Sequence, residues 1–283
     1  MKKLIFPIAI LSLLLTACGG GQNGGDGQNS AGGVTEGFLC EKEGESGQGE
    51  DGKELLCQVM GDGKLAWRSD SSPSADATPS SSCPTPLLQT PVDLSKVTSI
   101  LYPGQERGGD YKAHGGFGFD NATDNLVTVK IPLSGKITSV VRYREMGEIQ
   151  YLFEFEGDCG VSFRFDHLRK LTAKFEAIVN AFPIKEDTRT DPVNPPVAVT
   201  VGEVIATEVG FLNNVSVDFG VYDMRQKNEA SKDPAWASAH SQFPADSYGI
   251  CWFDSLPQAD SLVVKSLPSR DGTNQGKTSD YCK

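Results

Sequence analysis

The sequence lacks the short motifs that mark the commonest catalytic centres. It contains no GxSxG, no HExxH and no P-loop pattern, which disfavours the hydrolases and nucleotide-binding proteins that depend on them. It has no CxxC pair, which disfavours a structural zinc knuckle. Basic residues are also scarce, because 26 Lys and Arg stand against 37 Asp and Glu and the net charge is −11. Such a chain repels phosphate backbones, so we expect no nucleic-acid partner.

The sequence has no hydrophobic run long enough to cross a bilayer. The apolar stretch from Leu4 to Ala17 falls short of the roughly 20 residues that a spanning helix needs. It lies between a lysine pair and Cys18, which is the order of a secretory signal with a cysteine at its cleavage site. This pattern resembles the bacterial lipoprotein signal, and the resemblance implies that residues 1–17 are removed and that Cys18 receives lipid, palmitate included. The alternative is a soluble secretory signal in which the cysteine is incidental.

Lipid attachment at Cys18 predicts a place in the cell envelope. We expect the acyl anchor to hold the protein on a lipid bilayer, facing outside the cytoplasm. Where the envelope has two membranes, the absence of aspartate at Gly19 favours the outer one by analogy.

The cysteines that remain after lipidation predict disulfide bonds. An even number outside the cytoplasm is typical of a disulfide framework, and six cysteines can pair in 15 ways. Closeness in the sequence favours Cys40 with Cys57 as one pair. The full set of candidates is Cys40, Cys57, Cys83, Cys159, Cys251 and Cys282.

The first third of the chain is predicted to consist of a tether, a small folded module and a linker. Residues 18–35 are glycine-rich and nearly free of apolar groups, which predicts a flexible tether. Residues 36–69 predict a small Cys-linked β-hairpin module, because two apolar runs flank a Gly-Asp-Gly turn. Residues 70–91 are rich in Ser and Pro and predict a linker.

Residues 92–225 predict a β domain, since the whole chain has 31 glycines and 16 prolines and such a composition disfavours helices. Apolar residues at helical spacing nevertheless predict one helix over His167–Phe182, ended by Pro183. Residues 226–283 show little periodicity and predict an irregular C-terminal wrap pinned by disulfides. Strands are expected at Val127–Ile131, Lys136–Tyr143, Ile149–Glu156, Gly160–Phe165, Val197–Val201, Val204–Thr207 and Val215–Tyr222.

Three segments of this domain resemble a known family when they are taken in order. They are His-Gly-Gly-Phe-Gly-Phe-Asp at 114–120, Phe-Asp-His-Leu at 165–168, and the pair formed by 199–206 and Ser-Val-Asp-Phe at 216–219. Together they resemble the lysostaphin-type zinc metallopeptidases, which carry an HxGxD motif, a Tyr-x-His-Leu segment and an HxHF strand. The resemblance covers about residues 100–225. It implies a mainly β fold, an antiparallel sandwich or open barrel with one helix.

The departures from the family pattern bear on function. Aligning the motifs puts Gly116 where the first ligand His stands, Asp218 where the second stands, and Ser216 at the catalytic His of that strand. Only Asp120 and His167 match functional positions. Because glycine offers no ligand and serine is a poor base at neutral pH, the resemblance implies a degenerate, non-catalytic member with no cofactor.

One arrangement would rescue metal binding. His114 lies two residues before Gly116 and so on the same side of an extended strand. It could join Asp120 and Asp218 in a metal site for zinc or a harder ion, with His167 as the catalytic residue beside them. The structural alternatives are that Asp120 caps a turn, that His167 begins the helix, and that Asp218 pairs with an arginine. The arginines in question are Arg164 and Arg225.

Three functions therefore remain open on the sequence. The first is a membrane-anchored surface lipoprotein whose non-catalytic peptidase-like domain binds an envelope ligand, such as peptidoglycan or an envelope protein. The second is an active zinc peptidase that cleaves peptidoglycan peptides with an altered ligand set. The third is a structural or adhesive lipoprotein.

The lipid anchor can be tested by replacing its acceptor. We expect Cys18→Ser to move the protein from the membrane fraction to the soluble extracytoplasmic fraction, because no thiol remains to be acylated. Fractionation and immunoblotting measure this, with Cys40→Ser as the control that keeps Cys18. Unchanged partitioning of Cys18→Ser would refute the anchor.

Overall fold

The computed structural model describes residues 34, 39–49, 52–59, 65–69, 82–120, 122–211, 213–270 and 279–282. The predicted signal over residues 1–17, Cys18, and the tether up to residue 33 lie outside the described residues. Within the described ranges, no helix reaches the length and hydrophobicity that crossing a bilayer requires.

The N-terminal module is a three-stranded antiparallel sheet in the order β1-β2-β3. Its strands are β1 (Ser46–Gln48), β2 (Glu54–Val59) and β3 (Leu65–Ser69). Leu55, Cys57 and Trp67 form its small buried cluster. A disulfide joins Cys40 to Cys57, as expected from their spacing. The β2–β3 pairing confirms the predicted hairpin, while its turn at 61–63 lies outside the described residues.

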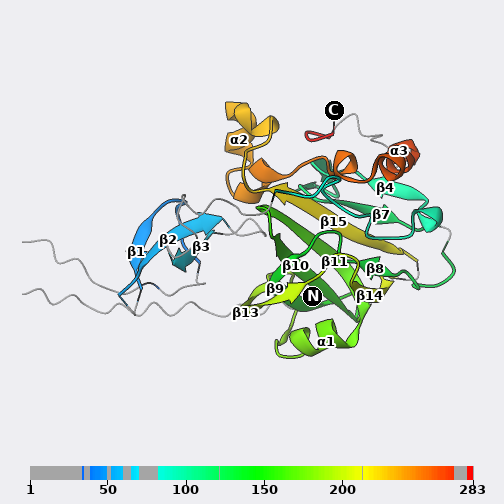
Figure 1. Ribbon diagram of the computed structural model, residues 1–283, viewed down its shortest axis with the longest axis horizontal. Helices are drawn as coiled ribbons and strands as arrows, with labels where there is room; N and C mark the ends of the chain where they lie inside the picture. Colours follow the sequence, from blue (N-terminus) through cyan, green and yellow to red (C-terminus); the bar gives the residue numbers. More distant parts are fainter. Residues whose placement is uncertain are drawn as a thin grey trace, which may run out of the picture. The chain divides into compact units, whose positions relative to one another are not determined.

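The main body is built on a ten-stranded sheet with the central order β12-β9-β10-β11-β15-β7-β4 (Figure 1). Its pairings are antiparallel except for the one between β12 and β9. The predicted fold class, mainly β with a disulfide-linked N-terminal hairpin, is confirmed. The strands are β4 (Ser99–Leu101), β7 (Gly115–Gly118), β8 (Val129–Lys130), β9 (Gly135–Glu145), β10 (Glu148–Gly157), β11 (Val161–Leu171), β12 (Ile184–Lys185), β13 (Asp191–Val199), β14 (Val204–Val209) and β15 (Ser216–Asp223), with β5 (Gln105–Arg107) and β6 (Asp110–Lys112) forming a separate pair.

The core follows the alternation expected of β15. Val217, Phe219 and Val221 are fully buried on one face of that strand. Phe219 stacks on Phe165 of β11 with ring centroids 5.0 Å apart. Aromatic side chains on successive strands therefore form a continuous apolar layer, which holds β11 and β15 in register.

The helix predicted over His167–Phe182 is wrong in its first half. Strand β11 continues to Leu171, and the helix α1 spans only Ala173–Val179. Leu168 and Leu171 suit a helical period, but they lie in the strand and pair with β14. His167 consequently sits inside a strand, with φ of 61° at an irregularity of the β10–β11 ladder.

The C-terminal segment is more regular than predicted. Residues 226–283 contain the helices α2 (Pro234–Ala239) and α3 (Gln258–Ser266), so the single helix expected for the fold becomes three α-helices in the described ranges. Trp252 is fully buried, with its ring 4.9 Å from Phe117 and 5.1 Å from Phe219. A disulfide joins Cys251 to Cys282. In Figure 1 this segment runs along β4 and β7, so it completes the core of the β domain.

The linker predicted over 70–91 ends early. Leu88 is fully buried in the main core, and its backbone N–H donates to Ser255 O over 2.9 Å. Cys83 is bonded to Cys159 at the start of β11. Residues 82–91 therefore belong to the packed domain.

The contribution of the C-terminal segment can be measured through Trp252. We expect Trp252→Ala to lower the free energy of unfolding by about 3–5 kcal/mol, because it removes a large aromatic side chain from a fully buried site. Urea denaturation followed by circular dichroism measures this. Leu262→Ala on α3 is the control, since Leu262 is 64% exposed and its loss should change stability by under about 0.5 kcal/mol. Equal effects of the two changes would contradict a core role for Trp252.

Candidate functional site

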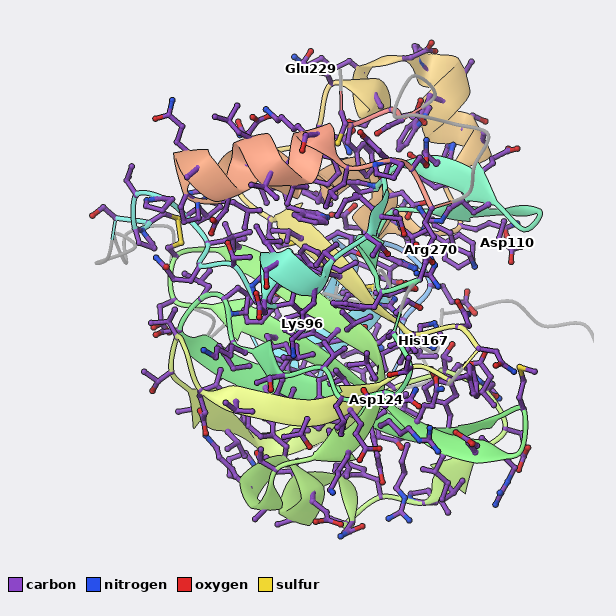
Figure 2. The ribbon with its side chains drawn as sticks, turned by 90° about the vertical axis from the view of Figure 1, so that its right-hand side faces the viewer. Lys96, Asp110, Asp124, His167, Glu229 and Arg270 are labelled. Carbon is purple, nitrogen blue, oxygen red and sulfur yellow. A yellow bond between two sulfur atoms is a disulfide. The ribbon has the colours of Figure 1, made fainter. Side chains whose placement is uncertain are left out.

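The candidate site lies across three neighbouring strands, β7, β15 and β11. Asp218 of β15 is paired with Gly116 of β7 on one side and with Asp166 of β11 on the other. This register brings together His114, which precedes β7, and His167 on β11, which is labelled in Figure 2. Three of the four residues singled out from the sequence, His114, His167 and Asp218, thus meet.

Asp218 is the shared partner of both imidazoles. The Nε2 atom of His114 lies 3.0 Å from Asp218 Oδ2. The Nε2 atom of His167 lies 3.6 Å from the same oxygen. The side chains of His114 and Asp218 are each 14% exposed, and that of His167 is 25% exposed. The cluster is therefore largely shielded from water, where charge interactions are stronger than at the surface.

The other face of His167 is held by polar groups from β9 and β10. Its Nδ1 lies 2.7 Å from Gln150 Oε1, 3.2 Å from the Tyr143 hydroxyl and 3.4 Å from Glu145 Oε2. These contacts fix the plane of the imidazole. The positive φ of His167 is held in place by the same surroundings, because its backbone N–H donates to Asp166 Oδ1 over 2.7 Å.

Asp166 links the two halves of the cluster. Its Oδ1 also accepts from the Tyr143 hydroxyl over 2.7 Å. Its Oδ2 accepts from Arg164 Nη2 over 2.9 Å. Arg164 therefore pairs with Asp166, and Arg225 pairs with Asp223, so neither is the partner of Asp218 that the sequence suggested as an alternative.

The two histidines carry different charges at neutral pH. Burial lowers the pKa of His167, but the charges of Asp166 and Asp218 and the hydrogen bond to Glu145 outweigh it and raise the pKa to about 10. Burial lowers the pKa of His114 and outweighs the attraction of Asp218. His114 is thus a neutral imidazole that donates its Nε2–H to Asp218. Burial raises the pKa of Asp218, but the neighbouring histidines more than compensate and hold it well below its usual range.

Asp120 does not join this cluster, so the structure does not bring together the predicted metal set of His114, Asp120 and Asp218. Its Oδ2 accepts from the hydroxyls of Thr98, over 2.9 Å, and Ser99. Its Oδ1 forms an ion pair with Arg270 Nη1 at 2.9 Å. Arg270 follows α3 in the C-terminal segment, and its Nη2 donates to Asn214 Oδ1 over 2.6 Å (Figure 2). A guanidinium therefore neutralises the carboxylate that the sequence resemblance aligns with a metal ligand.

Strand β7 has no room for a ligand side chain at the position where the family has its first histidine. A Cβ atom built on Gly116 would lie 2.6 Å from Val217 O, which is backbone. A Cβ on Gly118 would lie 2.1 Å from Arg270 Nη1. In the part of the chain that the structure describes, no group of three or more His, Cys, Asp or Glu residues is placed to hold a metal ion. The residues present do not fit the zinc site that the resemblance implies.

Several residues of the cluster, and the partner of Asp120, were not predicted from the sequence. Asp166 stands next to His167 in the quoted motif, so its position was a usable signal. Tyr143 and Gln150 are polar positions in predicted strands, and nothing in the sequence around them indicates a contact with His167. Arg270 lies in a segment without periodicity, and no sequence signal connects it with Asp120. The third histidine, His240, stacks on Trp236 at the end of α2.

Two cavities of the described domain lie away from the histidine cluster. One of about 300 Å³ is lined by residues of 90–96 and 119–130. Another of about 270 Å³ is lined by residues around the Cys83–Cys159 disulfide. Neither is lined by His114, His167 or Asp218, so the cluster is a packed network with no substrate-sized space of its own among these cavities.

The protonation of the two histidines can be measured directly. We expect the His167 imidazole to titrate near pH 10 and that of His114 below pH 6.5 in NMR spectra of the folded protein. Because the folded pKa of His167 exceeds its ordinary value of 6.5, its stabilising effect is complete below pH 6.5 and is lost as the pH rises towards 10. The difference in unfolding free energy between the wild type and His167→Gln should therefore shrink over that range. A difference that stays constant would contradict a charged His167.

Comparison with known proteins gives only distant similarities. No protein-family model and no curated protein sequence matches the chain. The crystal structure of Helicobacter pylori Csd3 shares 12% identity over 63% of this chain and 37% of its own, with a TM-score of 0.29. The solution structure of lysostaphin shares 16% identity over 49% of this chain and 49% of its own, also with a TM-score of 0.29. The chain spans less than half the length of either structure. At this identity and TM-score the similarity is limited to a distant likeness in how the strands are arranged.

Proposed function

We propose that this protein is an envelope lipoprotein whose lysostaphin-like domain is non-catalytic and binds a cell-wall or envelope ligand. The observation that carries the proposal is the ion pair between Arg270 and Asp120 beside a strand that has glycine at the first ligand position. The positive charge that the family draws from a metal ion is supplied here by an arginine of the same chain.

The acid–base properties of the cluster support a non-catalytic role. A general base must be unprotonated at working pH, and its ideal pKa lies near that pH. His167 is the residue that matches the family's catalytic position, and its pKa of about 10 keeps it protonated. Ser216 replaces the other histidine and is buried. The charges are already balanced within the cluster, so it stabilises the fold rather than a transition state.

The disulfides support the proposed location. Three disulfides are formed in the described residues: Cys40–Cys57, Cys83–Cys159 and Cys251–Cys282. Bonds of this kind persist in oxidising compartments and are rare in the cytosol. They fit a protein exported by the signal that ends at Cys18. A non-catalytic domain that is anchored in the envelope would act by binding. The cell wall is the ligand surface that lies within reach of the lipid anchor.

The absence of a functional metal centre is tested by zinc analysis. We expect the purified protein, after dialysis with zinc, to hold far less than one zinc per chain and to leave isolated peptidoglycan uncleaved, since its ligand positions do not fit zinc. Mass spectrometry of metals and chromatography of released muropeptides measure these. His114→Ala is compared with the control His240→Ala, whose histidine lies outside the cluster. Stoichiometric zinc that His114→Ala removes and His240→Ala retains would establish the peptidase alternative instead.

The binding role is tested on isolated cell walls. We expect the protein lacking residues 1–18 to sediment with purified peptidoglycan at low and moderate salt. Sedimentation followed by gel densitometry measures the bound fraction, with serum albumin as the acidic control protein. If the protein stays in the supernatant while it is folded by circular dichroism, a structural or adhesive role replaces cell-wall binding.

A further inference from the structure

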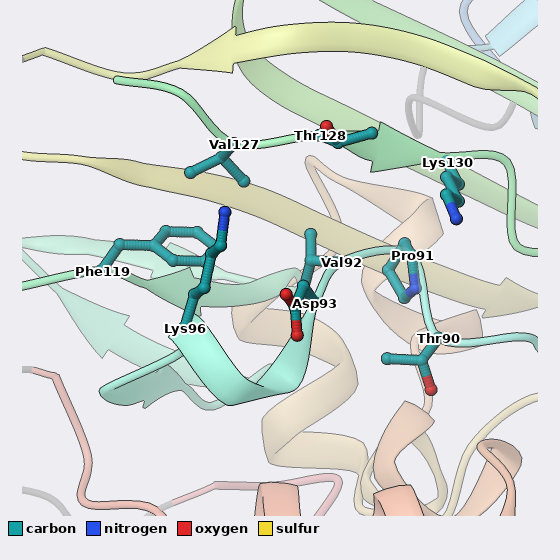
Figure 3. A pocket seen from close by; sticks show the side chains of 9 residues that line it. All are labelled: Thr90, Pro91, Val92, Asp93, Lys96, Phe119, Val127, Thr128 and Lys130. Atoms are coloured by element: carbon teal, nitrogen blue, oxygen red, sulfur yellow. The ribbon is translucent and has the colours of Figure 1, made fainter. Parts of the chain in front are cut away.

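The 300 Å³ cavity is a pocket between the segment 90–96 and the strand region 127–130 (Figure 3). Its inner wall is apolar, because Val92, Phe119 and Val127 are all less than 8% exposed. Its polar lining includes the side chains of Lys96 and Lys130. Figure 3 shows Lys96 extending from its helical turn towards Val127, and Lys130 extending from the opposite strand towards Pro91. The two ammonium groups thus border the pocket from opposite sides, with Asp93 between them in this view.

The pocket has more positive than negative charge, in contrast to the chain as a whole, whose net charge is −11. Both lysines are exposed, and no ion pair or hydrogen bond joins either ammonium to another residue that the structure describes. Both act through their charge on the carboxylate of Asp93. Asp93 is the one carboxylate in the lining, and its Oδ1 already accepts from the backbone N–H of Ser95 over 3.0 Å and from the Ser95 hydroxyl over 2.7 Å. The carboxylate is therefore held as the cap of the short helix Leu94–Lys96.

The pocket is preformed by the fold. The backbone N–H of Lys130 donates to Pro91 O over 2.8 Å, which ties the two walls together. The hydroxyl of Thr90 donates to Asp260 on α3, which holds the start of the segment 90–96 in place. Because the backbone that carries the lysines is fixed, little ordering of the chain opposes the entry of a ligand.

We propose that this pocket binds a small organic anion, a carboxylate or a phosphate ester carried on a short apolar group. The anionic head lies near Lys96 and Lys130, whose ammonium groups attract its negative charge and can donate to its oxygens. The apolar group lies against Val92, Phe119 and Val127. A volume of about 300 Å³ is at the small end of ligand pockets and suits a single ring or a short acyl group. This site is separate from the histidine cluster and does not rest on the function proposed above.

The proposal is tested by calorimetry and NMR titration with three probes on the folded chain lacking residues 1–18. Benzoate and phenyl phosphate carry the two anionic heads on the same ring, and benzamide is the uncharged analogue. We expect one or both anions to bind with affinity that falls as salt is raised, and benzamide to bind much more weakly. The stronger of the two anions identifies the preferred head group. Shifts in the amides of 90–96 and 127–130 locate the site.

Variants separate this pocket from non-specific attraction. Lys96→Gln/Lys130→Gln should weaken binding by roughly tenfold for each ammonium lost, because hydrogen bonds to charged groups are worth about that factor. The matched control Lys136→Gln/Lys170→Gln removes the same charge from exposed positions on β9 and β11 and should leave binding unchanged. The proposal is overturned if no anion binds at millimolar concentration, if benzamide binds as well as benzoate, or if both double variants weaken binding equally.

Discussion

The ion pair between Arg270 and Asp120 joins parts of the molecule that are far apart in the sequence. The segment that carries Arg270 lies along β4, where its backbone N–H donates to Ile100 O over 2.9 Å. Its guanidinium occupies the space that a Cβ atom on Gly118 would enter. The glycine at position 118 and the arginine of the C-terminal segment are therefore one constraint. A substitution at either place affects the packing of the other.

The histidine cluster shows how buried carboxylates are made tolerable. Asp166 and Asp218 are placed on adjacent strands, where unpaired negative charges would be costly to bury. Arg164 and the protonated His167 supply positive charge on one side, and the neutral His114 donates a hydrogen bond on the other. Every one of these groups is used in holding the network together. Loss of a single member would leave a neighbour buried without its partner.

The sequence predicted what local pattern controls. The alternation of apolar residues in β15 predicted which of its faces is buried. The order of the motifs predicted that His114, His167 and Asp218 could come close together. The helix was misplaced because Leu168 and Leu171 suit either period, and pairing with β14 decides between them. The role of Asp120 could not be predicted, since it depends on an arginine that reaches it only after the whole domain has folded. The packing of the C-terminal segment was missed for the same reason.

Two disulfides cross between segments that are distant along the chain. The Cys83–Cys159 bond spans 76 residues and the Cys251–Cys282 bond spans 31. On chain-entropy grounds, each removes roughly 4 kcal/mol of freedom from the unfolded chain. A newly made copy kept in a reducing cytosol would lack both restraints, and its terminal segments would dock less firmly on the sheet. The redox state of the surroundings therefore decides how firmly these segments are held to the sheet.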